Sequence, residues 1–200
     1  VLEVGLGGRL DATTAHPRRP LIAMASIGLD HCEHLGSTLE TIATEKAAVI
    51  TRGSCVVSAE QHPDVRAVLE HKCRQNGAEL RWVKPLDRSW RLGLDGELQR
   101  KNAAVARGVL QALEPHGWTL TDDDLRTGFA QARWNGRLQR VRWRNHPLLL
   151  DGAHNPHAAQ QLNLERRHWP GEETGIDWIL GIQSHKQAVA MLQTLLKPQD

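Results

Sequence analysis

The chain has 200 residues, of which 40% are hydrophobic and 24% charged, with a net charge of +2 at pH 7. This composition is typical of a globular protein with length for one large domain or two small ones, and the nearly neutral charge, without a long basic run, argues against a nucleic-acid partner. No apolar run approaches the ~18 residues of a membrane span, and the odd count of three cysteines favours a reducing cytoplasm over a disulfide framework or a zinc site.

Residues 1–4 have the pattern of a buried strand, except that Glu3 stands where an aliphatic residue would be expected. Because a buried charge that loses its partner costs about 3–5 kcal/mol, we expect Glu3 to face a cation or a metal. The glycines at 5–8 (GLGG) allow a sharp turn and the close approach of a ligand at the carboxyl end of a parallel strand. The alternative is a plain strand–loop joint in which Glu3 contacts a neighbouring arginine. Leu10 occupies the third glycine position of the dinucleotide fingerprint, so a Rossmann pyrophosphate loop is not expected here.

Strand and helix patterns then alternate along the chain. Pro63 lies in the first turn of a predicted helix that Gly77 ends, and a capping box of Ser37 and Glu40 predicts the start of an earlier helix. This alternation predicts an α/β fold in which helices cover a parallel sheet. The predicted elements are a strand at 21–27, a helix at 37–50 followed by Gly53, a strand at 55–58 and a helix at 63–75.

Lys46 lies in the apolar stripe of the helix predicted at 37–50, among Ile42, Ala43 and Ile50. From the helix pattern alone, the favoured interpretation is a lysine whose side chain snorkels past Ala43 to water.

The pattern changes after residue 80. Residues 80–98 carry short apolar runs broken by Pro and Gly, which predict a small β ribbon added to the sheet. A helix is predicted at 102–113, and a capping box of Thr121 and Asp124 predicts another that ends near Ala132.

Residues 134–137 (WNGR) interrupt this pattern, and we place a domain boundary at 132–137. The predicted domains are residues 1–132 and 133–200, and the second is short for a complete domain. Its predicted elements are strands at 138–143 and 148–150 joined by an Asn-His-Pro turn, a helix after DGAHNP, and a strand at 177–182.

Polar residues follow three predicted strands: Glu3, then Asp30 with His31, then Asp151 with His154. Because the carboxyl ends of neighbouring parallel strands meet at one edge of a sheet, we expect these side chains to converge. Glu3 and His31 would supply a hard oxygen and an imidazole, an incomplete set that Mg²⁺ accepts when phosphates and waters complete it. A lone histidine is more often a surface or core residue, so this hypothesis depends on the convergence.

Several motifs match a known family in their order and spacing: GLGGRLDAT, SIGLDH with LGSTLETIATEKAA, QRKNAAVA, WNGR and DGAHNP. Together they resemble the folylpolyglutamate synthase and dihydrofolate synthase branch of the Mur ligase superfamily, over nearly the whole chain. The resemblance implies a parallel-sheet ATPase domain of P-loop type, N-terminally truncated, at 1–132. It also implies a Rossmann-like α/β domain, C-terminally truncated, at 133–200.

The resemblance further implies three groups of site residues. The first group binds the metal. In it, a carbamate on Lys46 would replace a costly buried cation by an anion that can bind a metal, and Lys46 is the expected catalytic residue. The expected Mg²⁺ ligands are Glu3, His31 and carbamylated Lys46. The expected ATP-binding residues are Asn102, Arg137, Asp151 and His154. The expected contacts to the pterin substrate are Leu10, Asp11 and Ala12.

The activity implied by the resemblance is an ATP-dependent carbon–nitrogen ligase of folate biosynthesis and one-carbon metabolism. ATP would phosphorylate the carboxylate of folate or dihydropteroate, and the amino group of L-glutamate would then attack the acyl phosphate. We expect a cytoplasmic monomer with small-molecule substrates. No lysine follows a glycine, so the phosphate-binding GxxxxGK[ST] loop is missing. Since the family places that loop upstream of Glu3, and neither an initiating Met nor a signal peptide is present, we expect an inactive fragment.

Two other functions stay open at this point. One is another Mur-type ligase, which joins an amino acid to a cell-wall precursor by the same chemistry. The other is a non-catalytic nucleotide-binding or scaffold protein, which a GxxxxGK[ST] segment in the upstream coding sequence would argue against. Product analysis is needed to decide whether glutamate is added to dihydropteroate, to folates or to both.

Overall fold

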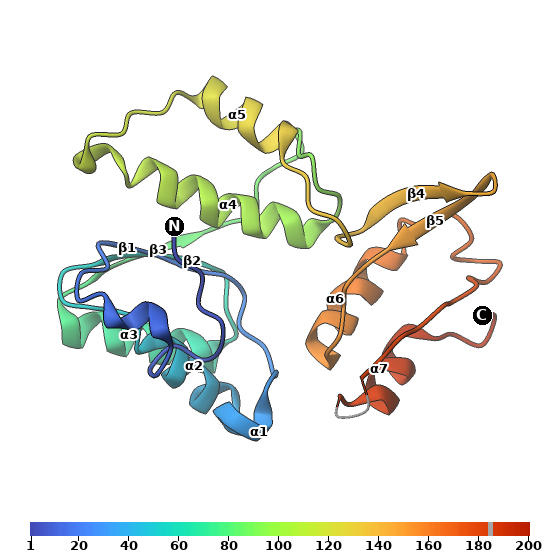
Figure 1. The fold of residues 1–200 in the computed structure, drawn as a ribbon, viewed down its shortest axis with the longest axis horizontal. Coiled ribbons are helices and arrows are strands. Elements are labelled where there is room, and N and C mark those ends of the chain that lie inside the picture. Colours follow the sequence, from blue (N-terminus) through green and yellow to red (C-terminus); the bar gives the residue numbers. More distant parts are fainter. Residues whose placement is uncertain (184–185) are drawn as a thin grey trace. The chain divides into compact units, whose positions relative to one another are not determined.

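Two compact units make up the chain in the computed structural model, which describes residues 1–183 and 186–200 (Figure 1). Unit 1 contains Val1–Gly93 and Leu98–Arg133, and unit 2 contains Leu94–Glu97 and Trp134–Asp200. None of the helices in the described ranges is long and apolar enough to cross a membrane.

The centre of unit 1 is a three-stranded parallel sheet in the order β1 (Leu21–Met24), β2 (Cys55–Ala59) and β3 (Glu79–Val83). The register aligns Ala23 of β1 with Val57 of β2. The parallel pairing confirms the α/β fold expected from the alternation of strand and helix patterns.

Helices α2 (Leu39–Ala47) and α3 (Pro63–Asn76) cover one face of this sheet (Figure 1). Their fully buried residues, among them Ile42 and Leu69, share a core with Val56 of β2. These apolar contacts hold the C-terminal part of α2 in place, which matters because α2 carries Lys46.

Helix α4 (Glu97–Gln111) covers the opposite face, where its Val105 packs against Val57 of β2. Neighbouring residues of β2 belong to different cores because side chains alternate across a strand. Helix α4 approaches the sheet closely at Gly108, because a Cβ added to this glycine would lie 2.7 Å from Cγ1 of Val57. The helix begins five residues earlier than the predicted start at Asn102.

The first turns of α2 and α3 are set by local side chains. Thr38 caps α2: its hydroxyl accepts from the Thr41 N–H at 3.2 Å, and the Thr41 hydroxyl accepts from the Thr38 N–H at 3.3 Å. The predicted Ser37–Glu40 box is wrong because the helix begins at Leu39, which makes Thr41 its third residue. Helix α3 begins at Pro63 and is followed by Gly77 at φ 55°, and both features confirm the prediction.

Two β elements predicted in unit 1 are wrong. Residues 1–4 pair with none of β1–β3 in the described chain, and Val1, Leu2 and Glu3 are exposed. An apolar pattern does not make a strand unless a neighbour supplies ladder hydrogen bonds. The ribbon expected at 80–98 is instead β3 and an irregular connection, because the apolar residues of β3 pair in parallel with β2.

Short helical elements complete unit 1. Thr121 caps α5 (Asp122–Gln131), and its hydroxyl and N–H both donate to Oδ2 of Asp124, at 2.6 and 2.9 Å. These hydrogen bonds lower the pKa of Asp124 and confirm the predicted capping box. The others are η1 (Ala12–Ala15), α1 (Cys32–Leu35) and η2 (Glu114–His116).

Unit 2 opens with an antiparallel hairpin of β4 (Gln139–Trp143) and β5 (His146–Leu150). Arg144 and Asn145 form the turn, with φ of 44° and 70°, as a tight two-residue hairpin turn requires. The predicted Asn-His-Pro turn is wrong, because the two residues after Asn145 already belong to β5.

After β5 the chain turns into α6 (Pro156–Arg166), an order typical of a Rossmann-like fold. Asn155 caps α6 by accepting the N–H of Ala158 at 2.7 Å. Helix α7 (Ala188–Leu195) packs against α6 around the buried Met191. The strand predicted at 177–182 is wrong: within the described residues this segment is irregular and pairs with neither strand of the hairpin.

Arg166, at the end of α6, closes the core of unit 2. Its side chain is fully buried, and Nη1 donates to the Leu195 carbonyl at 2.7 Å. Both terminal nitrogens donate to the Asp200 carboxylate at 2.6 Å, and Nε donates to Glu172. The arginine holds the pKa of Asp200 below its ordinary value.

Replacing Arg166 by methionine is expected to lower the melting temperature of unit 2 by about 10 °C or more, because Asp200 loses its cation and Glu172 keeps only its ion pair with Lys197. Exposed Arg167→Met is the control and should melt like the parent. The fold lowers the pKa of Asp200 and of Glu172, so their contribution is present above the ordinary values of 3.8 and 4.5 and is lost at lower pH. Circular dichroism melts between pH 7 and 3 measure both effects. Equal melting of the two variants at pH 7 would contradict this role.

Candidate functional site

Asp11 fixes the glycine loop, residues 5–10. One carboxylate oxygen accepts the N–H groups of Gly5 and Leu6 at 2.9 and 3.2 Å. The other accepts the N–H and the hydroxyl of Thr13 at 2.9 and 2.7 Å. These hydrogen bonds, led by the Thr13 hydroxyl, favour the charged form and lower the pKa of Asp11 to about 2.

A carbon-13 titration of the Asp11 carboxyl group is expected to give a pKa near this value, well below the ordinary 3.8. Because the folded-state pKa is lowered, the loop contacts stabilise the fold above pH 3.8 and are lost as the pH falls towards 2. Thr13→Ala should raise the measured pKa by removing the strongest of these hydrogen bonds. An unchanged titration in that variant would show that Thr13 does not hold the carboxylate.

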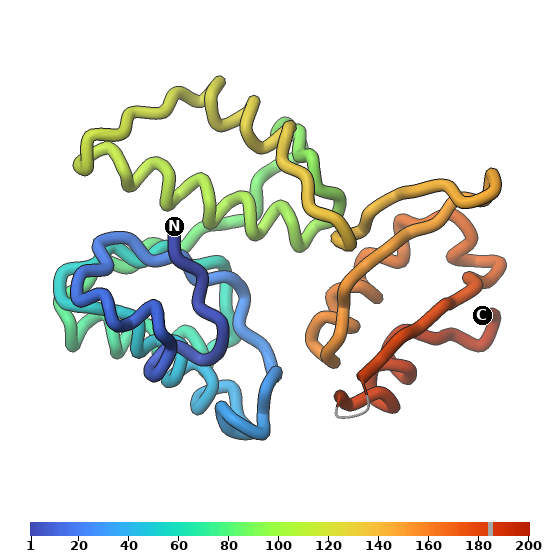
Figure 2. The backbone as a smooth tube through the Cα atoms, in the orientation of Figure 1, coloured from blue at the N-terminus to red at the C-terminus, as the bar shows by residue number. Residues whose placement is uncertain are grey.

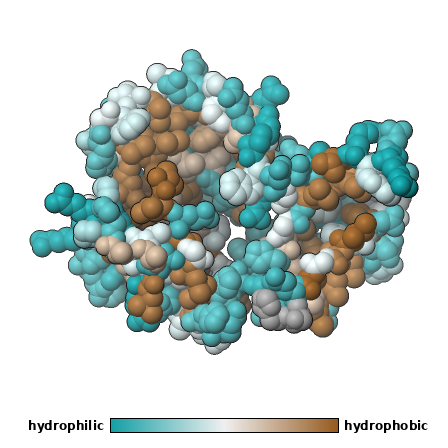
Figure 3. Space-filling view, viewed as in Figure 1, coloured by the Kyte–Doolittle hydropathy of each residue, from teal (hydrophilic) through white to brown (hydrophobic). Residues whose placement is uncertain are grey.

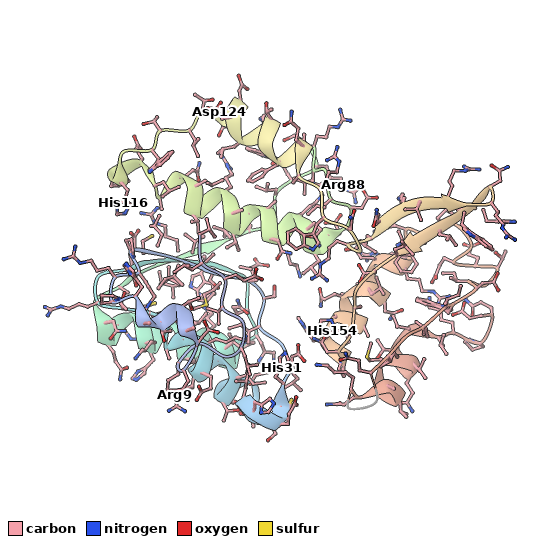
Figure 4. All side chains as sticks on the ribbon, in the orientation of Figure 1. Arg9, His31, Arg88, His116, Asp124 and His154 are labelled. Atoms are coloured by element: carbon pink, nitrogen blue, oxygen red, sulfur yellow. The ribbon has the colours of Figure 1, made fainter. Side chains whose placement is uncertain are left out.

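The glycine loop docks on the C-terminal end of α2 (Figure 2). The Arg9 N–H donates to the Glu45 carbonyl at 3.1 Å, and the Arg9 guanidinium pairs with the Glu45 carboxylate at 2.7 Å (Figure 4). A Cβ on Gly8 would lie 2.7 Å from the Glu45 carbonyl and 3.1 Å from that of Lys46. Glycine is therefore required at position 8 for this contact.

This docking brings the backbone carbonyl of Lys46 close to the glycine loop at Gly8. Lys46 is half-buried on α2, three residues after the buried Ala43 and four before the buried Ile50, which lies beyond the end of the helix. Partial burial is compatible with a side chain that reaches water and with a carbamate. Carbamylation of Lys46 and its role as a metal ligand stay predictions.

His31 adopts a left-handed backbone conformation, with φ 50°, which is uncommon outside glycine. Its carbonyl accepts the Leu35 N–H at 2.9 Å and its own N–H donates to Oδ1 of Asp30 at 2.9 Å. The imidazole lies near two acids, with Nε2 3.6 Å from Asp30 Oδ2 and Nδ1 3.9 Å from Glu33 Oε1. Strained conformations of this kind cluster at functional sites.

Glu3 is exposed, so the expectation of a carboxylate buried in a strand is wrong. Exposure removes the need for a buried partner but leaves the carboxylate available as a ligand. The described residues contain no group of three or more His, Cys, Asp or Glu side chains that could hold a metal ion. A Mg²⁺ site that phosphates and waters complete does not need such a group.

The other candidate residues of unit 1 differ in burial. Leu10 is 89% exposed, and Ala12, the first residue of η1, is also exposed, as a contact surface for a ligand requires. Asn102 is half-buried on α4, where its amide donates to Oε1 of Gln99 at 3.2 Å. Asp11 differs from both neighbours because its carboxylate is already engaged by the loop.

In unit 2 the turn before β4 and the turn after β5 are joined through Asp151. Its two oxygens accept the N–H groups of Leu138 and Ala153 at 2.9 and 2.8 Å. The Gly152 N–H donates to the Gly136 carbonyl at 2.8 Å, which brings the exposed Arg137 and His154 to the same end of the hairpin. The structure thus groups Arg137, Asp151 and His154, three of the residues expected to bind ATP.

Sequence reasoning missed the contacts of Arg9 and the loop-fixing role of Asp11. The Asp-Ala-Thr spacing was a usable signal for the second, because an aspartate commonly accepts the N–H two residues later. Nothing local indicates that Arg9 pairs with a residue on α2.

Comparisons with known proteins match the whole chain. Residues 135–200 match a family model described as the C-terminal domain of dihydrofolate synthetase. The chain is 34% identical to the dihydrofolate synthetase of Saccharomyces cerevisiae, in an alignment that covers 100% of this chain and 52% of that protein. It is 32% identical to the dihydrofolate synthase/folylpolyglutamate synthase of Bacillus subtilis, over 81% of this chain and 43% of the relative. The chain therefore spans about half the length of these relatives.

Solved structures give the same match at the level of the fold. One is the Escherichia coli FolC in complex with DHPP and ADP, with a TM-score of 0.80 and 28% identity. Another is the Mycobacterium tuberculosis folylpolyglutamate synthase complexed with ADP and AMPPCP, with a TM-score of 0.80 and 29% identity. Each likeness covers 96% of this chain and 48% of the solved chain.

Proposed function

The chain belongs to the folylpolyglutamate synthase and dihydrofolate synthase family of the Mur ligase superfamily, and on this basis we propose that its protein is an ATP-dependent amide ligase. One substrate is L-glutamate. The other, which receives the glutamate, is folate, dihydropteroate or either of these two. The observation that carries the proposal is the likeness, over 96% of the chain, to synthases whose structures hold ADP.

The chemistry requires activation of a carboxylate, which is a poor electrophile for an amine. Phosphoryl transfer from ATP gives an acyl phosphate, and attack by the glutamate amino group expels phosphate and forms the amide. The protein contributes mainly by positioning the reactants and by stabilising charge on the phosphoryl oxygens. The glycine loop and the turn at Asp151 are suited to such positioning, because each is held by hydrogen bonds from backbone N–H groups to a carboxylate.

We assign a Mg²⁺ site to Glu3 and His31, with Lys46 carbamylated as the third ligand. The donor set fits the ion because Mg²⁺ commonly takes one or two carboxylates and completes its shell with phosphates and waters. When bound, the ion would supply positive charge to the phosphate oxygens. The chain's own part is to hold α2 and the glycine loop together, through Arg9 and Glu45, so that Lys46 stays in place.

The remaining site residues divide between the two units. In the proposed enzyme, Asn102, Arg137, Asp151 and His154 bind ATP, while Leu10, Asp11 and Ala12 contact the pterin substrate. We propose that 1–132 is the ATPase domain and 133–200 the ligase domain of a cytoplasmic monomer.

Product analysis tests this function. The protein expressed from its complete reading frame is incubated with ATP, Mg²⁺ and L-glutamate, and with dihydropteroate or tetrahydrofolate in separate reactions. We expect a glutamylated product and one ADP for each amide formed. A glutamylated product from cell-wall nucleotide precursors alone would favour the other Mur-type ligases. ATP binding without any product would favour a non-catalytic protein.

A further inference from the structure

The β4–β5 hairpin carries positive charge that the proposed catalytic site does not use. Residues 137–150 contain no acidic residue, and the hydrophilic surface at the hairpin tip is visible in Figure 3. The arginines of this segment are all exposed: Arg137, which the proposed function assigns to ATP, and Arg140, Arg142 and Arg144, which it does not use.

The strand geometry gives these charges a regular spacing. Arg140 and Arg142 lie two residues apart on β4, so their side chains leave the same face about 7 Å apart. Leu149 and Pro147 are their cross-strand partners, and neither offers a counter-charge. Arg140 pairs with Asp95 at 2.9 Å, but both side chains are more than half exposed, and such a pair exchanges readily for another carboxylate.

The tip of the hairpin is organised by its turn. The Arg144 guanidinium lies 4.7 Å from the centre of the Trp143 ring, and Trp143 is 56% exposed. A guanidinium stacked by its face keeps its edge N–H donors available for a carboxylate. Arg142 donates to the carbonyl and side-chain oxygens of Asn145 at 3.0 and 3.2 Å, which holds this arginine beside the turn.

One end of this strip adjoins the candidate ATP-binding turn. Arg137 lies two residues before β4, and the N–H of the intervening Leu138 donates to Asp151 at 2.9 Å. From Arg137 to Arg144 an extended chain covers about 20–25 Å. A ligand held near Asp151 could therefore extend along the hairpin towards Arg140, Arg142 and Arg144.

We propose that the β4–β5 hairpin binds the oligo-γ-glutamyl chain of folate substrates and products, with Arg140, Arg142 and Arg144 pairing successive α-carboxylates. This inference rests on the proposed function, which adds one carboxylate-bearing glutamate at a time. Charge complementarity favours this occupant, because a flexible chain with one negative charge per residue can reach both the two cations on one face of β4 and Arg144 at the turn. A nucleic acid would require a broader basic surface than a chain of net charge +2 offers.

Binding of a fluorescein-labelled tetra-γ-glutamate to the 200-residue chain, without ATP or folate, tests the hairpin directly. Arg142→Gln/Arg144→Gln is expected to weaken binding about 3- to 10-fold, as the loss of two exposed ion pairs predicts. The matched control is Arg52→Gln/Arg74→Gln, which removes the same charge from exposed positions of unit 1 and should bind like the parent. Arg142→Lys/Arg144→Lys keeps the charge and should bind within about threefold of the parent.

Three results of this assay would overturn the inference. They are no binding by the parent, equal weakening in the two Gln pairs, and a single-stranded DNA oligonucleotide that binds as tightly and competes for the same arginines. Melting curves show whether the Arg142→Gln/Arg144→Gln variant folds. If it does not, tetra-γ-glutamate binding by the Arg142→Lys/Arg144→Lys variant and by the parent is measured at low and at high salt. Loss of tetra-γ-glutamate binding at high salt supports the inference, and salt-independent binding overturns it.

Steady-state kinetics separate this inference from the proposed function. In the protein from the complete reading frame, the Arg142→Gln/Arg144→Gln pair should raise KM for a tetraglutamyl folate about 3- to 10-fold and leave KM for the monoglutamate unchanged. Normal turnover with the same KM for both tail lengths in parent and variant overturns the hairpin site and leaves the ligase intact. No turnover in the parent contradicts the ligase, and the binding assay then decides the hairpin site alone.

Discussion

Replacement of Lys46 by alanine is expected to lower kcat/KM for glutamate ligation by about 100-fold or more in the protein from the complete reading frame. The proposed reason is loss of the carbamate that holds Mg²⁺ against the phosphates. Alanine is a good helix former and Lys46 is only half-buried, so the melting temperature should change by no more than a few degrees. Lys46→Glu should recover part of the activity, because it restores a negative charge on a shorter side chain.

Lys72→Ala is the matched control for this prediction. Lys72 is also half-buried and lies on α3, the helix that packs against α2, but it is not an expected ligand. Its removal should leave activity near that of the parent. Normal turnover of Lys46→Ala, together with an unmodified lysine by native mass spectrometry in bicarbonate, would favour the lysine that merely reaches water.

Asp151→Ala is expected to lower kcat/KM for ATP about 10- to 100-fold, because small misplacements of binding groups have effects of this size. The substitution removes the acceptor for the Leu138 and Ala153 N–H groups and so releases the turn that carries Arg137. His154→Ala should have a smaller effect, since it removes one side chain and leaves the turn closed.

Asp177→Ala is the control for Asp151, because it removes an exposed carboxylate of the same unit. Thermal melts are needed for both variants, so that a loss of activity can be distinguished from unfolding. If ATP kinetics are unchanged in Asp151→Ala and in His154→Ala, neither residue belongs to the ATP site.

Elements that begin or end with local chemistry could be predicted from the sequence. Pro63 and Gly77 delimit α3, and the Thr121–Asp124 box starts α5, because each signal lies within a few residues of the helix end that it sets. The box at Thr38 was missed by a single residue. Such a shift is common where several Ser, Thr and Glu residues are adjacent.

Features that depend on a distant partner could not be predicted. The apolar residues at 1–4 predicted a strand, but strand formation depends on a neighbour that no local pattern identifies. Glu3 was therefore placed wrongly, although its residue type suits a ligand. The ion pair of Arg9 with Glu45 and the contact of Arg166 with Asp200 join residues more than 30 positions apart.

The candidate site was predictable where one motif contains several of its residues. Asp151 and His154 lie in DGAHNP, so their proximity follows from the sequence alone, and Arg137 joins them because the hairpin returns the chain to its start. His31 was predicted from its place after a strand, but its left-handed backbone was not, because that conformation is unusual for histidine.

Transfer of oxygen-18 from a labelled substrate carboxylate tests the acyl-phosphate route most directly. The protein from the complete reading frame is given ATP, L-glutamate and a folate or dihydropteroate labelled in the carboxylate that receives glutamate. The released phosphate is then analysed by mass spectrometry. Activation of the carboxylate by ATP predicts that each phosphate released with an amide carries one labelled oxygen. Phosphate that carries no label, released while the glutamyl amide is formed, would contradict the proposed ligase mechanism.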